Sequence, residues 1–258
     1  GRSYAGVLKC FTRFFVQNEE SKRLLEGIGI TAVDVVGDTR FDRVLQIKEA
    51  AKQLPICEAF RTGVASSQSA DVPHHDFKVF VAGSSWPPDE NIFIPFFNEH
   101  KDWRLLIAPH VIAEEHLKLI LSLIKDKKVV RYTQTTPEEA AEADVLIIDC
   151  FGLLSSMYNY GDVAYIGGGF GVGIHNTLEA AVWNMPVIFG PNNKKFQEAQ
   201  GLLKSDGGFE INTYEDFSGL MSSLMNDEAF LKQAGDKAGA FVAHLAGATD
   251  KVLASVKL

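Results

Sequence analysis

Short runs of apolar residues recur along the chain from residue 77 onward. They are rich in β-branched or aromatic residues, and each ends near Gly, Pro, Thr or Cys. Runs that are apolar on both faces are typical of strands buried in a parallel sheet. The predicted strands lie at residues 77–83, 103–109, 127–133, 145–150, 163–168, 186–190 and 209–213.

Stretches of helical periodicity lie between these runs. In residues 111–126, for example, the apolar side chains at helical spacing are Ile112, Leu117, Ile120, Leu121 and Ile124. Strands that alternate with helices predict an α/β fold with a doubly wound, parallel, Rossmann-like sheet. We therefore expect residues 77–258 to form one Rossmann-like domain.

The first 43 residues repeat this pattern on a smaller scale. Residues 11–17 and 33–37 are predicted strands, and the helix between them has Asn18 as N-cap and Gly27 as C-cap. Two strands and one helix are too few for a stable core of their own. Residues 1–43 are therefore predicted to be the tail end of another, N-terminal domain.

Residues 44–76 are predicted to connect the two domains. Within them, residues 60–76 are rich in Ser, Gly and Pro and lack periodicity, which favours a linker or an exposed loop. The chain does not begin with Met, and we expect the protein to extend upstream of Gly1.

Composition and charge narrow the class of protein. The chain is 46% hydrophobic with a net charge of −8, and an acidic chain lacks the basic face with which proteins bind nucleic acids. No apolar run approaches the roughly 18–20 residues that span a bilayer, and the first residues do not resemble a signal peptide. Cys10, Cys57 and Cys150 are widely spaced, as expected for unpaired thiols in a reducing compartment. We expect a soluble globular chain.

The segment IGGGFGVGIHNTLEAA, residues 166–181, joins a glycine-rich loop to a helix predicted to begin at about Asn176. Glycines let an anion reach backbone N–H groups, and a helix start adds a partial positive charge, so the segment predicts a phosphate cradle. It matches neither the dinucleotide fingerprint nor the P-loop. Alternatively, the glycines serve tight packing, and Asn176 with Glu179 forms a capping box. His175 favours the binding interpretation because it adds a possible cationic donor.

Polar residues also follow the other predicted strands. They are Ser84 and Ser85 after the first, His110 after the second, residues 132–136 after the third, Gly152 at a helix start after the fourth, and Lys194, Lys195 and Glu198 after the sixth. Each could be a plain cap or a surface residue. Because the carboxyl ends of parallel strands share one edge, their convergence predicts a nucleotide or nucleotide-sugar site. No H-x-x-x-H or D-x-D motif occurs, so we expect neither a metal nor a cofactor.

Several stretches resemble one known family. FFVQNEESKRLLEGIGI, VVGDTRFDRV, VAGSSWPPDE and AYIGGGFGVGIHNTLEAAVWNMPVIFGPNNKKFQEA are similar to the Kdo transferases of lipopolysaccharide biosynthesis. These glycosyltransferases move Kdo (3-deoxy-D-manno-octulosonic acid) from CMP-Kdo to a lipid A precursor. The resemblance implies a GT-B architecture of two Rossmann-like domains. It also implies a place on the cytoplasmic face of the inner membrane of Gram-negative bacteria.

The resemblance also implies roles for particular residues. Ser84 and Ser85 would line the donor cleft, Gly152 would approach the base, and Glu179 would accept hydrogen bonds from the ribose, while His110 is a candidate for substrate binding by its place at a strand end. The residues expected around the CMP phosphate are Gly168, Gly169, Phe170, His175 and Asn176. The chain departs from the family twice: it has Pro109-His110-Val111 where many members have Pro-Arg-His, and Gly152-Leu153-Leu154 where others have Gly-Glu-Leu. The roles of that arginine and that glutamate cannot be carried over.

The family's general base, membrane anchor and acceptor-binding surface belong to the N-terminal half, upstream of this chain. We therefore expect the chain to be mainly the donor-binding half, to bind CMP weakly and to transfer nothing alone. Two alternatives stay open. One is another GT-B enzyme that uses a UDP-sugar, either a transferase or a UDP-N-acetylglucosamine epimerase. The other is a non-catalytic nucleotide-binding domain.

Overall fold

The computed structural model describes residues 6–65 and 76–256. Contacts between residues divide the chain into two compact units. One unit contains residues 47–241, and the other contains residues 1–46 together with 242–258. The domain boundaries predicted from the sequence, after residues 43 and 76, remain a prediction.

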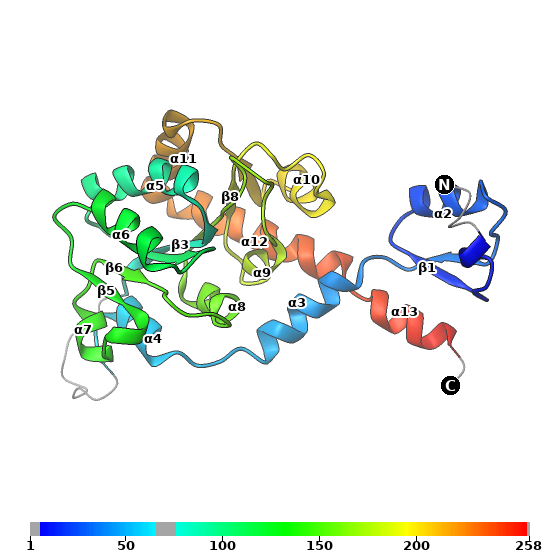
Figure 1. Cartoon of the computed structure of the whole chain (residues 1–258), viewed down its shortest axis with the longest axis horizontal. Coiled ribbons are helices and arrows are strands. Elements are labelled where there is room, and N and C mark those ends of the chain that lie inside the picture. The colour runs from blue at the N-terminus through cyan, green and yellow to red at the C-terminus, as the bar shows by residue number, and fades with distance from the viewer. Residues whose placement is uncertain (1–5, 66–75, 257–258) are drawn as a thin grey trace. The chain divides into compact units, whose positions relative to one another are not determined.

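The larger unit is built on a seven-stranded parallel sheet (Figure 1). Its strands are β3 (Lys78–Ser85), β4 (Trp103–Pro109), β5 (Val129–Arg131), β6 (Val145–Ile147), β7 (Val163–Ile166), β8 (Val187–Phe189) and β9 (Gly208–Glu210). Their spatial order is β5-β6-β4-β3-β7-β8-β9, and every neighbouring pair is parallel. All seven strands predicted in this region are therefore confirmed, although several are shorter than predicted.

Along the chain, helices lie before, between and after the strands of the sheet. They are α4 (Pro55–Thr62), α5 (Pro87–Glu99), α6 (Glu114–Leu123), α7 (Pro137–Ala141), α8 (Leu154–Met157), α9 (Leu178–Ala181), α10 (Gln197–Lys204) and α11 (Tyr214–Asn226), with short 3-10 turns η1 (Tyr132–Gln134) and η2 (Tyr158–Tyr160). The divisions between the two units fall within two further helices, α3 (Thr39–Glu49) and α12 (Glu228–Leu245).

The core of the larger unit lies on both faces of the sheet. On one face, Phe80 and Ala82 of β3 pack with aromatic residues of α5 and with Phe217 of α11. Val79 and Val81 alternate with them along β3 and are equally buried. Side chains of successive strand residues point to opposite faces, so both faces of β3 are covered. This double covering explains the continuous apolar runs in the sequence.

The smaller unit contains β1 (Phe14–Val16) and β2 (Val33–Val35), which pair in parallel, together with α2 (Glu19–Glu26) and α13 (Ala248–Ser255). Asn18 caps α2 as predicted, since its side chain accepts a hydrogen bond from the N–H of Ser21 at 2.8 Å. The C-terminal helix belongs to this unit because Asp42 accepts hydrogen bonds from the N–H groups of Gly247 and Thr249.

Two sequence-based expectations are corrected. The start of the predicted linker is helical: Phe60 lies in α4 and is fully buried. Pro55 begins that helix and Gly63 ends it in the left-handed conformation, so the local signals bracket a helix. Residues 66–75, including the His74–His75 pair, lie outside the described residues.

The second correction concerns the helix after the glycine loop. The helix expected from Asn176 begins at Leu178, with Thr177 as its N-cap, and has four residues.

Candidate functional site

The strand order reverses between β3 and β7. From β3 the chain proceeds to β4 on one side, and from β7 to β8 and β9 on the other. In open α/β sheets, ligands bind at such a switch point, beyond the carboxyl ends of the strands. The two segments that leave the sheet there are residues 84–88 and residues 167–177, both of which the sequence singles out.

Close backbone contacts account for three consecutive glycines of the 167–177 loop. A Cβ on Gly167 would lie 2.2 Å from the carbonyl oxygen of Ser84, and one on Gly169 would lie 2.5 Å from the nitrogen of Gly190. Gly168 has φ +92°, and a Cβ there would lie 2.4 Å from the carbonyl oxygen of Gly173. Tight packing thus explains these glycines without excluding a ligand.

The N–H groups of this loop fall into two sets. Those of Gly171 and Gly173 donate to the carbonyl of Gly168, and that of Gly168 donates to Asp89 at 2.9 Å. Within residues 6–65 and 76–256, no group accepts a hydrogen bond from the N–H groups of Gly169, Phe170, Val172, Ile174, Asn176 and Thr177. Those of Gly169 and Phe170 directly follow the turn that Gly168 makes.

Asp89, in the first turn of α5, anchors the loop. Its side chain is fully buried and accepts hydrogen bonds from the N–H groups of Trp86 and Gly168, both at 2.9 Å, and from the hydroxyl of Tyr165 at 2.8 Å. Burial raises the pKa of Asp89, and these hydrogen bonds oppose that shift. Sequence reasoning missed Asp89, although an acidic residue three positions after a helix start, behind two prolines, is a known capping signal.

Three aromatic side chains meet above the switch point. The ring of His110, which follows β4, stacks on Trp86 with centroids 4.6 Å apart and on His175 with centroids 4.5 Å apart. The indole Nε1–H of Trp86 donates to Nε2 of His175 at 3.2 Å. Burial lowers the pKa of His175, the neighbouring His110 lowers it further, and Asp89 opposes both. The structure thus brings together His110 and His175 as predicted and adds Trp86.

The two serines at the end of β3 differ in their surroundings. Ser84 is partly exposed with φ +53°. Ser85 is fully buried, and its hydroxyl donates to Glu90 at 2.8 Å. The other oxygen of Glu90 lies 2.8 Å from Nε2 of His116, whose Nδ1 lies 2.7 Å from the carbonyl oxygen of Val111. The hydroxyl of Ser85 therefore serves this buried network.

Asn176 and Glu179 contact each other through their side chains. The amide of Asn176 donates to Glu179 at 3.0 Å, while its oxygen accepts from the N–H of Leu178 at 3.1 Å. The capping box considered from the sequence does not form, because α9 begins after Thr177. Burial raises the pKa of Tyr158, and the nearby charge of Glu179 raises it further. Tyr158 in turn packs against Gly83, at the carboxyl end of β3.

Phe170 and Gly152 have contrasting positions. Phe170 packs against Gly190, where an added Cβ would lie 2.8 Å from the Phe170 ring. It also lines a cavity of about 110 Å³, whose lining residues are Trp86, Pro88, Asp89, Gly168, Phe170, Gly171 and Val172. Gly152 is exposed in the left-handed conformation, two residues before α8. A Cβ on Gly152 would meet no described atom within 4 Å, so no other predicted site residue packs against that side of it.

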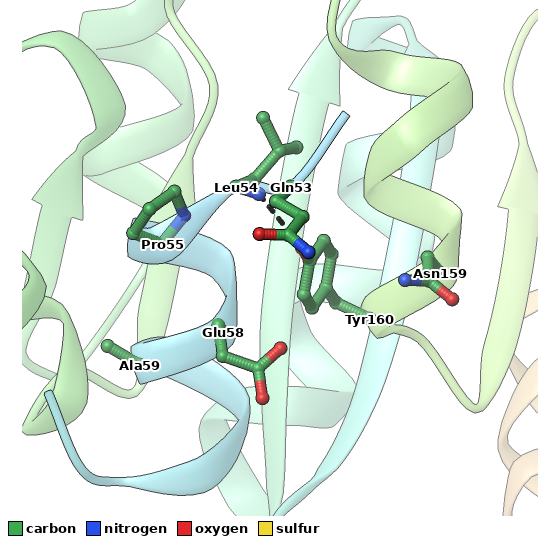
Figure 2. Close-up of a pocket in the computed structure, with 7 residues that line it drawn as sticks. All are labelled: Gln53, Leu54, Pro55, Glu58, Ala59, Asn159 and Tyr160. Atoms are coloured by element: carbon green, nitrogen blue, oxygen red, sulfur yellow. Dashed lines mark hydrogen bonds between the residues drawn. The ribbon is translucent and has the colours of Figure 1, made fainter. Parts of the chain in front are cut away.

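A larger hollow lies elsewhere in the larger unit. It has a volume of about 500 Å³ between α4 and η2, and Figure 2 shows its lining residues: Gln53, Leu54, Pro55, Glu58, Ala59, Asn159 and Tyr160. Leu54 N–H donates to the hydroxyl of Tyr160 at 2.9 Å. Tyr160 precedes β7, so the hollow lies toward the amino ends of the strands, and none of its lining residues was predicted to bind a ligand.

Neither a metal-binding cluster nor a membrane-spanning helix occurs among the described residues. In residues 6–65 and 76–256, no cluster of three or more His, Cys, Asp or Glu side chains could hold a metal ion. Among the helices of the same ranges, none combines the length and the apolarity needed to cross a membrane.

The chain is similar to known proteins in both fold and sequence. A parallel, doubly wound sheet of this kind is the architecture of a GT-B glycosyltransferase domain, so the predicted fold class is confirmed. No protein-family model matches the chain. It is, however, similar to a protein from Rickettsia prowazekii named 3-deoxy-D-manno-octulosonic acid transferase, with 26% identity over 239 residues, 90% of this chain and 48% of the relative. The resemblance to the Kdo transferases is confirmed: the chain is similar to proteins of that name in sequence. It spans about half the length of the curated relatives it matches.

Solved structures agree in fold. The C-terminal CMP-Kdo binding domain of WaaA from Acinetobacter baumannii superposes with a TM-score of 0.56 at 16% identity, covering 78% of this chain and 97% of that domain. HepE from Anabaena, solved with UDP-glucose, superposes with a TM-score of 0.52 at 11% identity, covering 95% of this chain and 64% of that protein. At these identities the likeness establishes the fold alone.

Proposed function

We propose that this chain is the donor-binding part of a Kdo transferase, which moves Kdo from CMP-Kdo to a lipid A precursor in lipopolysaccharide synthesis. The observation that carries the proposal is the meeting of the loops after β3, β4 and β7 at the switch point of the sheet. Its support from relatives is twofold: curated proteins similar to the chain bear the name of that transferase, and a CMP-Kdo binding domain shares its fold.

In this proposal the 167–177 loop holds the phosphate of CMP. The N–H groups of Gly169 and Phe170 face the phosphate, Gly168 shapes the turn, and His175 and Asn176 lie beside it. Preorganised N–H groups stabilise charge that develops on a leaving group without reorganising during the reaction. They would thus assist departure of CMP while the acceptor hydroxyl attacks the anomeric carbon of Kdo.

The remaining donor contacts follow from the same placement. Glu179 would accept hydrogen bonds from the ribose hydroxyls, Gly152 would approach the base, and Ser84 and His110 would line the cleft. Because the hydroxyl of Ser85 already donates to Glu90, Ser85 would contribute by fixing the end of β3. We propose no metal in this donor site.

The rest of the enzyme completes the proposal. Residues 1–43 would close the acceptor domain, residues 44–76 would connect the domains, and residues 77–258 would bind the donor. The acceptor-binding surface, the general base and the membrane contact would belong to the N-terminal half, at the cytoplasmic face of the inner membrane of a Gram-negative bacterium. General-base assistance is typically worth about 10²–10⁴ in rate, so the 258-residue chain alone would bind the donor without transferring it.

Calorimetric titration of the 258-residue chain with CMP and, separately, with UDP tests the proposal. We expect tighter binding of CMP, and a weakening of about 10-fold or more in Glu179→Gln, because a hydrogen bond to a charged group is worth about 1.5–3 kcal/mol. Glu215→Gln, which changes an exposed glutamate in α11, is the matched control and should bind CMP normally. Preference for UDP, or unchanged CMP affinity in Glu179→Gln, would contradict the proposal.

A further inference from the structure

Trp86, His110 and His175 come from three different loops but form one aromatic cluster. They follow β3, β4 and β7, respectively, and both ring stacks that involve His110 have centroids less than 5 Å apart. A hydrogen bond from Trp86 Nε1–H to His175 Nε2, at 3.2 Å, connects the first and third members of the cluster. One ring stack and one hydrogen bond hold the imidazole of His175 and leave it little freedom to rotate.

The hydrogen bond from Trp86 determines where His175 carries its proton. An indole N–H can only donate, so Nε2 of His175 must be the acceptor and therefore unprotonated. A neutral imidazole then carries its proton on Nδ1. No partner for Nδ1 is recorded within residues 6–65 and 76–256. Trp86 therefore fixes the tautomer of His175. The Nδ1–H of that tautomer donates to no described residue.

The surroundings of His175 favour the neutral form. The titratable groups that face it are His110, from the end of β4, and Asp89, from α5; burial and His110 lower its pKa, and Asp89 raises it. Asp89 is itself occupied by three hydrogen-bond donors. The ring also packs tightly against the loop, because a Cβ on Gly168 would lie 3.3 Å from Cδ2 of His175.

We propose that Trp86 is a positioning residue, which holds His175 as the neutral Nδ1–H tautomer so that this N–H donates to a phosphate oxygen of a nucleotide bound at the 167–177 loop. The ligand part of this inference rests on the proposed function, whereas the tautomer does not. A neutral donor of fixed direction suits an anion that must be released, since it recognises the oxygen by geometry rather than by a full positive charge.

Nuclear magnetic resonance on the 258-residue chain with ¹⁵N-labelled histidine tests the tautomer directly. Long-range ¹H–¹⁵N correlations at pH 7.5 distinguish a protonated Nδ1 from a protonated Nε2, and the spectrum of His175→Gln assigns the signal. We expect a protonated Nδ1 in the wild type. In Trp86→Phe, which keeps an aromatic ring but lacks the donor, the signal should shift toward the Nε2–H form. An Nε2–H tautomer in the wild type, or an unchanged tautomer in Trp86→Phe, would overturn the proposal.

Titration with CMP tests the ligand part. We expect the His175 nitrogen signals to move on CMP binding, and Trp86→Phe to weaken CMP binding by about 3- to 10-fold, the range of one neutral hydrogen bond. Trp183→Phe is the matched control, because it also removes an indole donor, here one that bonds the carbonyl of Ser155 at 3.1 Å, and it should bind CMP normally.

The outcomes of the two measurements separate the two proposals. If the tautomer changes in Trp86→Phe but CMP affinity and the His175 shift do not, the ligand part is wrong. If the wild type does not bind CMP at all, the proposed function fails, while the tautomer measurement still decides the role of Trp86.

Discussion

The carboxylate of Asp89 accepts a hydrogen bond from the backbone N–H of Gly168 at 2.9 Å, although 79 positions separate the two residues in the sequence. The same oxygen accepts from the N–H of Trp86, and the other accepts from the hydroxyl of Tyr165. One buried side chain thus joins the start of α5, strand β7 and the glycine loop. The geometry of the candidate site depends on this junction.

Replacing Asp89 by Ala should therefore destabilise the protein by about 3 kcal/mol or more, because it leaves two buried donors and one part-buried donor unpaired, and each buried donor costs about 1–3 kcal/mol. Asp89→Asn should cost less, since an amide oxygen keeps part of the acceptor capacity. Urea unfolding of the two variants measures the difference. Asp102→Ala, at an exposed aspartate, should stay within about 0.5 kcal/mol of the wild type. Equal losses in Asp89→Ala and Asp102→Ala would refute the role of the junction.

Gly168 and Gly152 offer a matched test of the glycine loop. Both have a left-handed φ, +92° and +82°, but a Cβ on Gly168 would lie 2.4 Å from a carbonyl oxygen, whereas a Cβ on Gly152 meets no atom within 4 Å. Gly152→Ala should lose about 1 kcal/mol from backbone strain alone. Gly168→Ala should lose clearly more stability and also move the loop, which CMP titration and thermal unfolding would both detect. Similar losses in both variants would show that crowding at Gly168 is unimportant.

The strands were predictable because their burial on both faces leaves a continuous apolar signal. The convergence of polar strand ends was predictable too, since parallel strands that reverse order bring their carboxyl ends to one point. Which polar side chains face outward was not predictable. Ser85 and Ser84 are identical neighbours, yet Ser85 turns inward because Glu90 and His116 lie behind it.

Two other features depend on tertiary contacts that a local pattern does not contain. Asp89 looks in the sequence like an ordinary capping residue, and only the packing of β7 beside β3 gives it Gly168 as a partner. Phe60 lies next to a Ser- and Gly-rich stretch that favours a loop, but its burial keeps it in α4. Sequence patterns thus locate the site, and long-range partners determine its side-chain geometry.

The buried carboxyl group of Glu90 should make the stability of the protein depend on pH. Burial raises the pKa of Glu90, and its hydrogen bonds to His116 and Ser85 oppose that shift. The folded state then holds a proton on Glu90 more tightly than the unfolded state. The resulting contribution to stability is fully present below the usual pKa of 4.5 and is lost as the pH rises through the higher folded-state pKa.

A comparison of Glu90→Gln with the wild type isolates this contribution. The free energy of unfolding of the wild type relative to Glu90→Gln should be largest near pH 4.5 and decline as the pH rises, as measured by urea titration at several pH values. Glu142→Gln, at an exposed carboxylate, controls for general charge effects and should not reproduce that decline. A relative stability that increases with pH would contradict the raised pKa.

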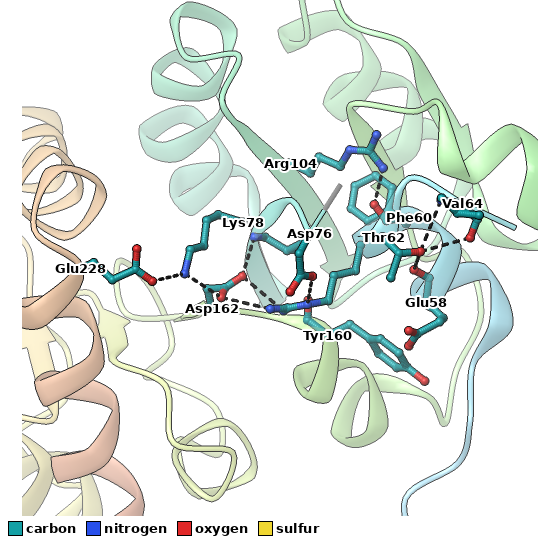
Figure 3. A network of polar contacts seen from close by, with 12 residues as sticks. Glu58, Phe60, Thr62, Val64, Asp76, Lys78, Arg104, Tyr160, Asp162 and Glu228 are labelled. Atoms are coloured by element: carbon teal, nitrogen blue, oxygen red, sulfur yellow. Dashed lines mark hydrogen bonds and ion pairs between the residues drawn. The ribbon is translucent and has the colours of Figure 1, made fainter. Parts of the chain in front are cut away.

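The last prediction concerns Asp162, at the amino end of β7, where several polar groups meet (Figure 3). Its carboxylate accepts from the N–H of Val79 at 2.8 Å and from both terminal nitrogens of Arg61 at 3.3 Å. Arg61 also donates to the carbonyl of Tyr160 at 3.0 Å, which ties α4 to the sheet. The side chains of Arg61 and Asp162 are only 23% and 12% exposed, so solvent screens this pair less than a surface pair.

Arg61→Lys keeps the charge but loses the planar fork that reaches Asp162 and Tyr160 together. We expect a loss of about 1–2 kcal/mol in the free energy of unfolding, measured by urea titration. Arg13→Lys is the matched control: Arg13 pairs with Asp34, and these side chains are 51% and 38% exposed, so the loss should stay below about 0.5 kcal/mol. Losses of the same size in both variants would show that the Arg61 fork adds nothing beyond an ordinary surface pair.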